Sequence, residues 1–345
     1  MQNDILSDIY EQPERLVEAL RAHLASGSLL DAAVRGLQKA QLRRIVLTGM
    51  GSSFFACYPA FLRLFEAGFA VNWIELSELL HWGGDIGRAT ALVLVSQSGE
   101  TVEAVRLLSD RSIAGPIVAV TNTLDSTLVQ RASYVVPLYA GPEQTVATKS
   151  YTTSLLALAL LAGRLAGVPA GALAEGLSAT IDAVAQVCAG GLESIAHLSP
   201  AWRDAGPITL VGRGPSFATA LAGGLLLKET AKIPAEGLSS AQFRHGPIEI
   251  AGPGHRAIVC GEPGATLQLD ARLAGELASY GSRVLLLGST SGVDLPDVET
   301  VELPSTNLAP LVQIIPLQLL AREMALRQGI APGSFRYGSK VTTRE

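Results

Sequence analysis

Short apolar runs alternate along this chain with longer segments in which apolar residues recur every three or four positions. The runs are rich in Val, Ile and Leu, which is typical of strands that a parallel sheet buries on both faces. The segments between them have the period and length of amphipathic helices. The pattern therefore predicts an α/β fold with strands at residues 44–47, 71–74, 91–95, 116–120, 134–138, 208–211, 256–260, 283–287 and 300–303.

A glycine-rich turn follows the first of these strands and returns later in the chain. Residues 49–53 read GMGSS, and residues 212–216, which also follow a predicted strand, read GRGPS. A strand–turn–helix pattern that restarts in this way indicates a tandem duplication of one α/β domain. Helical spacing also predicts two helices over residues 13–40 and a helical stretch over residues 150–187.

The predicted fold class is thus α/β, with two tandem doubly wound parallel-sheet domains. At 345 residues the chain is long enough for each domain to bury a core of its own. We place an N-terminal helical segment at residues 1–40, a first domain at 41–190, a second domain at 191–330 and a C-terminal tail at 331–345.

The turn after the strand at 91–95 is the first candidate for chemistry. Residues 96–101 read SQSGET and lead into an amphipathic segment that starts at Val102. Hydroxyl and amide groups at the end of a buried strand, next to the positive end of a helix dipole, favour binding of an anion such as a phosphate. The alternative is an ordinary strand-to-helix turn in which Ser98 caps the helix.

The glycine-rich turn at 49–53 supports the anion-binding interpretation. Neighbouring strands of a doubly wound sheet end at one edge, so the backbone of this turn and the Ser53 hydroxyl can reach the same anion as residues 96–101. A nicotinamide dinucleotide is disfavoured because Phe54 stands where the dinucleotide fingerprint has its third glycine. In the second copy Glu262 follows the equivalent strand and would repel phosphate, so we expect only the first copy to bind one.

Composition narrows the class of protein. The chain is 48% hydrophobic and 17% charged, which argues against disorder, and its net charge of −5 without a long basic run argues against nucleic-acid binding. The N-terminus lacks the features of a signal peptide and no apolar stretch is long enough to cross a membrane, so we expect a cytoplasmic protein. We expect Cys57, Cys188 and Cys260 to be buried thiols, and the five histidines are too scattered to predict a metal site.

Three further side chains are chemical candidates that also have structural interpretations. Glu229 lies late in a predicted helix rich in Ala, Gly and Leu, where partial burial would raise its pKa and suit it to proton transfer. Pairing with Lys228 or Lys232 on the surface is the alternative. His245 precedes Gly-Pro on a predicted turn, where it either faces a ligand or is structural, and Lys340 belongs to a segment with the composition of a solvated tail.

Together these segments resemble the sugar isomerase (SIS) domain family, and within it the isomerase half of glucosamine-6-phosphate synthase. The resemblance covers nearly the whole chain and implies two flavodoxin-like SIS domains with an ordered C-terminal tail that closes the active site. Its motifs are residues 8–13 (DIYEQP), 51–53 (GSS), 96–101 (SQSGET), 146–149 (VATK), 151–153 (YTT), 228–229 (KE), 244–247 (RHGP), 316–321 (PLQLLA) and 339–342 (SKVT).

The resemblance also implies roles for particular residues. Glu229 would move a proton between C1 and C2 of the open-chain sugar, and Lys340 would approach the carbonyl, with a Schiff base as one option. His245 would assist ring opening and would come from the neighbouring subunit of a homodimer. No metal or organic cofactor is implied. The phosphosugar contacts would be Gly51, Ser52, Ser53, Ser96, Gln97, Ser98, Thr101, Ala147 and Ser339.

Three departures from the synthase pattern bear on the activity. The chain begins Met1-Gln2, without the glutaminase domain and its cysteine nucleophile, so we expect that it does not draw ammonia from glutamine. Leu226 stands where the synthase has a lysine, three residues before the catalytic glutamate. Residues 143–149 form a segment one residue shorter than its counterpart, which bears on the contacts to the sugar.

We therefore predict a stand-alone amino-sugar phosphate isomerase or deaminase, with glucosamine-6-phosphate converted to fructose-6-phosphate and ammonia as the leading case. The alternatives are an aminotransferase-type isomerase of the synthase kind, a plain aldose–ketose phosphate isomerase and a phosphosugar deglycase. An alternative of a different class is a non-catalytic sugar-phosphate sensor. The sensor is disfavoured because Glu229, His245 and Lys340 accompany the anion-binding turn and no basic helix-turn-helix segment precedes the first strand.

Overall fold

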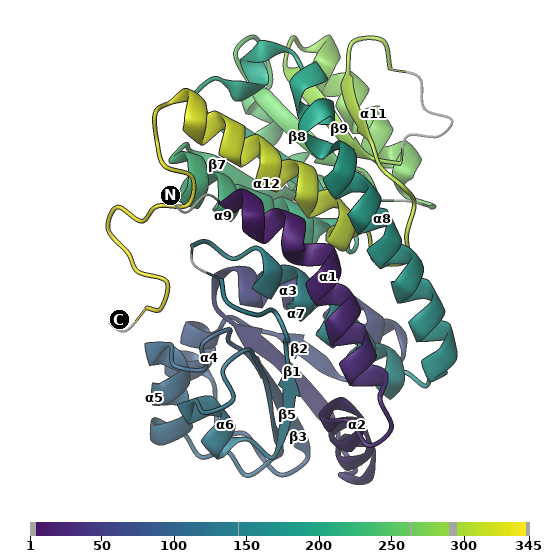
Figure 1. Ribbon diagram of the computed structural model, residues 1–345, viewed down its shortest axis with the longest axis vertical. Helices are drawn as coiled ribbons and strands as arrows, with labels where there is room; N and C mark the ends of the chain where they lie inside the picture. Colours follow the sequence, from purple (N-terminus) through teal and green to yellow (C-terminus); the bar gives the residue numbers. More distant parts are fainter. Residues whose placement is uncertain (1–4, 144, 263, 290–294, 343–345) are drawn as a thin grey trace. The chain divides into compact units, whose positions relative to one another are not determined.

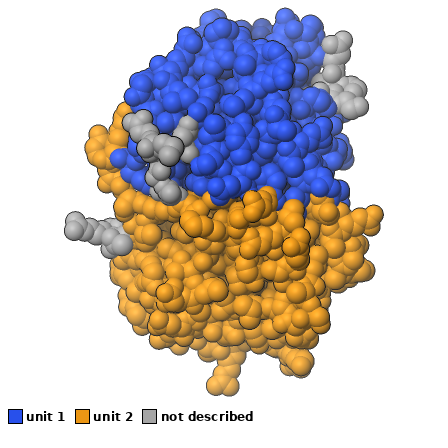
Figure 2. Space-filling model, in the orientation of Figure 1, with its two compact units in different colours: residues 1–13, 144–148, 179–335 blue, residues 14–143, 149–178, 336–345 orange. Residues whose placement is uncertain are grey.

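The chain divides into two compact units (Figure 2). Each unit contains one five-stranded sheet. A computed structural model describes residues 5–143, 145–262, 264–289 and 295–342. Unit 1 comprises residues 1–13, 144–148 and 179–335, and unit 2 comprises residues 14–143, 149–178 and 336–345. Each unit is therefore discontinuous in sequence, and helices α1 (Ile5–Leu24) and α8 (Ala170–His197) contribute residues to both.

Unit 2 contains a parallel five-stranded sheet in the order β2-β1-β3-β4-β5 (Figure 1). The apolar runs predicted in this part of the chain all form strands, which are β1 (Arg44–Gly49), β2 (Val71–Trp73), β3 (Thr90–Val95), β4 (Ile117–Thr121) and β5 (Tyr134–Pro137). Every neighbouring pair is parallel. The doubly wound architecture predicted for the first half is thus confirmed.

Helices cover both faces of this sheet, which explains why its central strands β1, β3 and β4 are buried along most of their length. Helices α4 (Leu76–Trp82), α5 (Val102–Asp110) and α6 (Thr127–Arg131) pack on one face, where they share a core with Leu92 and Leu94 of β3. Helices α2 (Leu29–Lys39), α3 (Gly51–Glu66) and α7 (Lys149–Leu165) lie on the other side in Figure 1.

Unit 1 repeats the same topology with the order β10-β9-β8-β6-β7. Its strands are β6 (Ile208–Gly212), β7 (Ala235–Ser239), β8 (Arg256–Cys260), β9 (Arg283–Gly288) and β10 (Glu299–Glu302). Read from β7 inwards, these strands follow one another as β2, β1, β3, β4 and β5 do in unit 2. The predicted tandem duplication of the fold is confirmed.

The faces of the second sheet are covered in the same way. Helices α9 (Ser216–Ala231) and α12 (Ala309–Arg327) pack against each other and against β6 and β9, respectively. Helix α11 (Leu267–Ser279) shares a core with β8 and β9 and with Phe243 of the short helix α10 (Ser240–Phe243). Two 3₁₀ helices, η1 (Pro200–Arg203) and η2 (Pro247–Ile250), complete the elements of this unit.

Three elements differ from the sequence-based expectation. Strand β7 was not predicted, because its sequence AEGLS is only partly apolar, as an edge strand allows. The single helical stretch predicted over residues 150–187 is two helices, α7 and α8, which Pro169 helps to separate. Helix α1 starts before the predicted region and continues through Pro13, close to a buried pair of amide hydrogen bonds between Gln12 and Gln318 within unit 1.

The cysteines behave as predicted, since Cys57, Cys188 and Cys260 are free and buried. Burial raises the pKa of each thiol, to about 12 for Cys188. Among the described residues, no cluster of His, Cys, Asp or Glu has the arrangement of a metal site. No helix in the described ranges is long and apolar enough to cross a membrane.

Candidate active site

The strand order of unit 2 creates a switch point between β1 and β3. At such a point the connections leave neighbouring strands in opposite directions, and ligands of doubly wound proteins bind in the crevice that opens there. Gly49, the last residue of β1, is the register partner of Val95, the last residue of β3. The structure therefore brings the turn at 49–53 and the turn at 96–101 to the same edge of the sheet, as predicted.

A helix begins directly after each of these turns. The N-cap residues are Met50 for α3 and Thr101 for α5, and neither makes a side-chain capping hydrogen bond. Backbone N–H groups at a helix N-terminus lack partners within the helix and carry the positive end of its dipole. Two helix N-termini without side-chain caps, beside one switch point, form a suitable setting for an anion.

The serines of residues 96–101 shape the turn rather than cap the helix. Ser96 Oγ accepts a hydrogen bond from the Gly99 amide at 3.1 Å, and Ser98 Oγ accepts one from the Glu100 amide at 3.2 Å. Gly99 has a φ of +66°, and a Cβ atom there would lie 2.2 Å from Ser126 Oγ, so the turn requires glycine. Ser98 is therefore not the N-cap, and the capping alternative for this turn is wrong.

One buried hydroxyl group in this turn, Thr101 Oγ1, lacks a hydrogen-bond partner among the described residues. A buried hydroxyl without a partner is costly, and the cost is relieved when a ligand supplies the missing hydrogen bond. We call residues 49–53 and 96–101 together the cradle.

The backbone of Gln97 is held by the strand next to β3. Its carbonyl oxygen accepts hydrogen bonds from the Asn122 amide at 3.1 Å, from Thr121 Oγ1 at 3.2 Å and from Thr123 Oγ1 at 3.3 Å. Because these bonds use the carbonyl, they fix the backbone without occupying the side-chain amide of Gln97. The loop after β4 thus holds one wall of the cradle in place.

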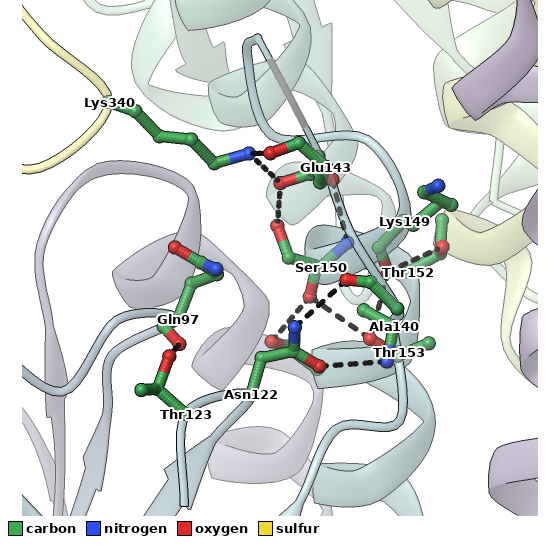
Figure 3. A network of polar contacts seen from close by, with 12 residues as sticks. Gln97, Asn122, Thr123, Ala140, Glu143, Lys149, Ser150, Thr152, Thr153 and Lys340 are labelled. Atoms are coloured by element: carbon green, nitrogen blue, oxygen red, sulfur yellow. Dashed lines mark hydrogen bonds and ion pairs between the residues drawn. The ribbon is translucent and has the colours of Figure 1, made fainter. Parts of the chain in front are cut away.

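Asn122 continues this polar network towards the loop after β5 (Figure 3). Its Oδ1 accepts from the Ala140 amide at 2.9 Å and its Nδ2 donates to the Gly141 carbonyl at 3.0 Å. The same loop ends in Glu143, whose side chain is only 1% exposed. The loops that follow β3, β4 and β5 are therefore joined at one edge of the sheet.

Glu143 binds the C-terminal tail. Its carboxylate accepts hydrogen bonds from the Ser150 amide at 3.0 Å and from Ser150 Oγ at 2.7 Å, and Lys340 Nζ lies 3.2 Å from its Oε2 (Figure 3). Lys340 also donates to the Glu143 backbone carbonyl. Lys340 is thus an ion-paired side chain of unit 2 and not the solvated lysine that composition alone suggests.

The tail also contacts the cradle helix. The amide of Val102, the first residue of α5, donates to the Thr342 carbonyl at 3.1 Å. Ser339 is exposed, and its hydroxyl donates to the Val341 carbonyl at 2.6 Å. Of the predicted tail at 331–345, residues 343–345 lie outside the described residues.

Glu229 lies in unit 1, near the end of helix α9. It is half-buried, and burial raises the pKa of its carboxyl group, while the positive charges of Lys232 and Lys228 oppose the shift. Lys232 ends the helix with a left-handed φ of 56° and donates through Nζ to the backbone carbonyls of Glu229 and Ser334. A raised pKa is the property expected of a carboxyl group that exchanges protons near neutral pH.

His245 is exposed on unit 1, in the turn between α10 and η2. Its amide donates to the Gln242 carbonyl at 3.0 Å. The preceding residue, Arg244, forms an ion pair of 2.6 Å with Glu276 of α11, which anchors the turn. The structure thus presents His245 at a surface of unit 1.

The predicted site residues fall into two groups. Unit 2 contains Gly51, Ser52, Ser53, Ser96, Gln97, Ser98, Thr101, Ser339 and Lys340, and unit 1 contains Ala147, Glu229 and His245. Leu226, at the position of the synthase lysine, is buried in α9. Sequence reasoning missed Asn122 as a support of the cradle and Glu143 as the partner of Lys340. Glu143 lies in the segment 143–149, which is one residue shorter than its counterpart in the synthase. No sequence pattern, however, predicts that Glu143 pairs with Lys340, which is 197 positions away.

The fold defines a class of protein, namely a tandem pair of doubly wound α/β domains, each with a switch point in its sheet. Comparison with known sequences identifies the family. Residues 38–164 and 202–327 each match the SIS domain, and the chain belongs to the SIS domain family.

The most informative relatives carry names from sugar-phosphate chemistry. The chain is 30% identical, over 99% of its length, to the glutamine–fructose-6-phosphate aminotransferase (isomerizing) of Pyrococcus horikoshii, and the match spans 58% of that relative. The solved C-terminal domain of glucosamine-fructose-6-phosphate aminotransferase from Francisella tularensis is 25% identical, with a TM-score of 0.88 over 97% of this chain and 99% of that one. Glucosamine-6-phosphate deaminase from Thermotoga maritima, at 21% identity and a TM-score of 0.76 with 99% of both chains covered, shares the fold.

Proposed function

We propose that this protein is a phosphosugar isomerase and deaminase whose substrate is an amino-sugar phosphate, with glucosamine-6-phosphate converted to fructose-6-phosphate and ammonia as the leading case. The observation that carries the proposal is the cradle, with two helix N-termini that lack side-chain caps and the unpartnered Thr101 hydroxyl at one switch point. The names of the relatives, which join an isomerising aminotransferase and a deaminase, support the choice of an amino sugar.

In the proposed reaction the phosphate group anchors the sugar in the cradle. His245 moves a proton between the anomeric hydroxyl and the ring oxygen, which opens the ring. The Glu229 carboxylate then removes the proton from C2 and, as a carboxylic acid, returns a proton to C1. A second proton passes from the C2 amine to the carbonyl oxygen, so that C1 carries a hydroxyl group and the amine becomes an imine. Water adds to this imine and ammonia leaves, which yields the ketose phosphate.

The ion pair of Lys340 supports a role for the tail in this reaction. Lys340 is positioned on Glu143 in the same unit as the cradle, and the tail accepts a hydrogen bond from the start of α5. If the Lys340 ammonium group moved from Glu143 to the substrate carbonyl, its positive charge would stabilise the negative charge that develops on the carbonyl oxygen during proton transfer. Whether Lys340 also forms a Schiff base is tested by borohydride trapping of the substrate on Lys340, followed by mass spectrometry.

The direct test is incubation of the purified protein with glucosamine-6-phosphate, with separate assays for ammonia and for fructose-6-phosphate. Equal amounts of both products are expected. Fructose-6-phosphate, glucose-6-phosphate and a phosphorylated sugar–amino acid adduct, assayed in parallel, distinguish a plain isomerase and a deglycase. Tight binding of phosphosugars with no turnover of any of them would favour a sensor and contradict the proposal.

The pH dependence of the reaction should reflect the environment of Glu229. Burial raises the pKa of this carboxyl group, and the group must be deprotonated to accept the C2 proton. We therefore expect kcat/KM to fall on the acidic side through a pKa above the usual range for glutamate, and to be retained at higher pH. An acid limb at the pKa of an ordinary exposed glutamate would argue against Glu229 as the base.

We further propose that the protein is a homodimer in which His245 serves the site of its partner, since His245 is exposed on unit 1. The test mixes two inactive variants, Glu229→Gln and His245→Ala, under conditions in which subunits exchange between dimers. A mixed dimer contains one site with both groups intact, so activity should return towards half of the wild-type value per mixed dimer. Mixing that restores nothing, although mixed dimers are shown to form, would place both residues in one chain's site.

A further inference from the structure

Unit 1 repeats the switch point of unit 2, down to individual positions. Gly212, the last residue of β6, is the register partner of Cys260, as Gly49 is of Val95 in unit 2. The turns GMGSS and GRGPS align Ser216 with Ser53 in sequence, although Ser216 is the first residue of α9 and Ser53 is the third residue of α3.

The second residue after strand β3 of unit 2 differs from the second residue after strand β8 of unit 1. Gln97 is the second residue after β3, and Glu262 is the second residue after β8. The two units therefore share the strand order at this point, and unit 1 has a carboxylate where unit 2 has an uncharged amide.

Glu262 binds the start of helix α9. Its Oε2 accepts a hydrogen bond from the Ser216 amide at 2.9 Å and another from the Ser216 hydroxyl. The N-cap residue of α9, Pro215, makes no side-chain capping bond, so the carboxylate of Glu262 satisfies the helix N-terminus in its place. A carboxylate held by the first amide and hydroxyl of a helix makes the contacts that a bound phosphate oxygen would make.

Further hydrogen bonds hold the turn that contains Glu262 in place. The Glu262 amide donates to Asp270 Oδ2 at 3.4 Å, and Asp270 Oδ1 accepts from Arg213 Nε at 3.1 Å. Gln313 Nε2 donates to the Gly261 carbonyl at 2.8 Å. Because the Arg213 and Asp270 charges balance one another, the charge of Glu262 is the one that faces the helix N-terminus.

We infer that Glu262 is a built-in substitute for a ligand phosphate, so that unit 1 contains a second anion site which the chain's own carboxylate occupies. The geometry explains why the repeated turn does not make a second ligand site in the native protein. It also keeps the N-terminus of α9, the helix that bears Glu229, satisfied whether or not a ligand is bound to unit 2. The ligand class of the vacated site is a tetrahedral oxyanion, the class of phosphate.

The inference is tested with Glu262→Gln, which gives unit 1 the side chain that unit 2 has at this position. Crystals of wild-type protein and of this variant are soaked in tungstate, a phosphate-shaped anion that is located by its anomalous scattering. We expect a tungsten peak within hydrogen-bond distance of the Ser216 amide in the variant and none there in the wild type. The added substitution Ser216→Ala should weaken that peak, because it removes one of the two donors. A variant with no peak at Ser216 would overturn the inference.

The reciprocal variant, Gln97→Glu, provides a second test in the other unit. Its new carboxylate should bind the Ser53 hydroxyl, since the Ser53 amide already donates to the Met50 carbonyl at 3.1 Å, and it should exclude tungstate from the cradle. A structure in which this carboxylate points away from Ser53 would contradict the inference even if Glu262→Gln does not fold. Binding of tungstate to the wild-type cradle is scored separately at Ser53 and Thr101, so a failure of the proposed function is distinguished from a failure at Ser216.

Discussion

Replacement of Glu229 by Gln is expected to lower kcat for glucosamine-6-phosphate by about 10²- to 10⁴-fold, the usual contribution of a general acid–base group. Gln has nearly the same shape but neither accepts the C2 proton nor returns one to C1. The dissociation constant of the phosphosugar should change little, because in the proposed site the phosphate is held by the cradle in unit 2. Steady-state kinetics and isothermal titration calorimetry on the same preparations measure the two quantities.

A matched control for this variant is Glu236→Gln, which removes an exposed carboxylate from strand β7 of the same unit. It should leave both kcat and the dissociation constant close to the wild-type values. If Glu229→Gln retained wild-type kcat, the base would have to be another residue. If it lost affinity and rate together, Glu229 would be a binding residue in the ground state instead.

Removal of the phosphate from the ligand is expected to have a comparably large effect on affinity. Hydrogen bonds to a charged group contribute about 1.5–3 kcal/mol each. Loss of only two of them would weaken binding of glucosamine relative to glucosamine-6-phosphate by about 10²- to 10⁴-fold. Calorimetric titration of both sugars into the protein measures the difference directly.

The source of this preference is tested by Thr101→Val, which keeps the shape of the side chain but removes the hydroxyl group. Thr101 Oγ1 is a buried hydroxyl without a partner among the described residues, so the variant should fold at least as stably as the wild type. Its preference for the phosphorylated sugar should shrink by about tenfold or more, as expected for one charged hydrogen bond. Equal affinity of the wild type for glucosamine and for glucosamine-6-phosphate would contradict a role of the phosphate group in binding.

Much of the fold follows from local pattern. Strands that are buried on both faces, such as β3 and β4, are continuous apolar runs, and the repeat of a glycine turn after β1 and β6 indicates the duplication. Strand β7 escapes this reasoning because an edge strand is stabilised by its neighbour rather than by its own apolar residues. Its Gly237 is required by close contact with the Ala220 backbone, which sequence pattern does not report.

The candidate site is predictable only in part. The cradle could be located from sequence because its residues are contiguous and follow strands that a doubly wound sheet places side by side. The partners that hold it in place are distant in sequence, as Asn122 is from Gly141 and Glu143 is from Lys340. The position of Glu262 at the second switch point could also be learned only from the structure. Sequence reasoning expected a carboxylate there to oppose phosphate, which stays a prediction, and it did not expect the carboxylate to bind Ser216.

The central claim is that a phosphosugar bound at the cradle exchanges a carbon-bound proton through Glu229. The most direct measurement is NMR of glucosamine-6-phosphate and of fructose-6-phosphate incubated with the protein in deuterium oxide. The account predicts deuterium at C1 of the ketose phosphate or at C2 of the aldose phosphate with wild-type protein, and none above background with Glu229→Gln. Incorporation that persists unchanged in Glu229→Gln, or that is absent from every phosphosugar tested with wild-type protein, would contradict it.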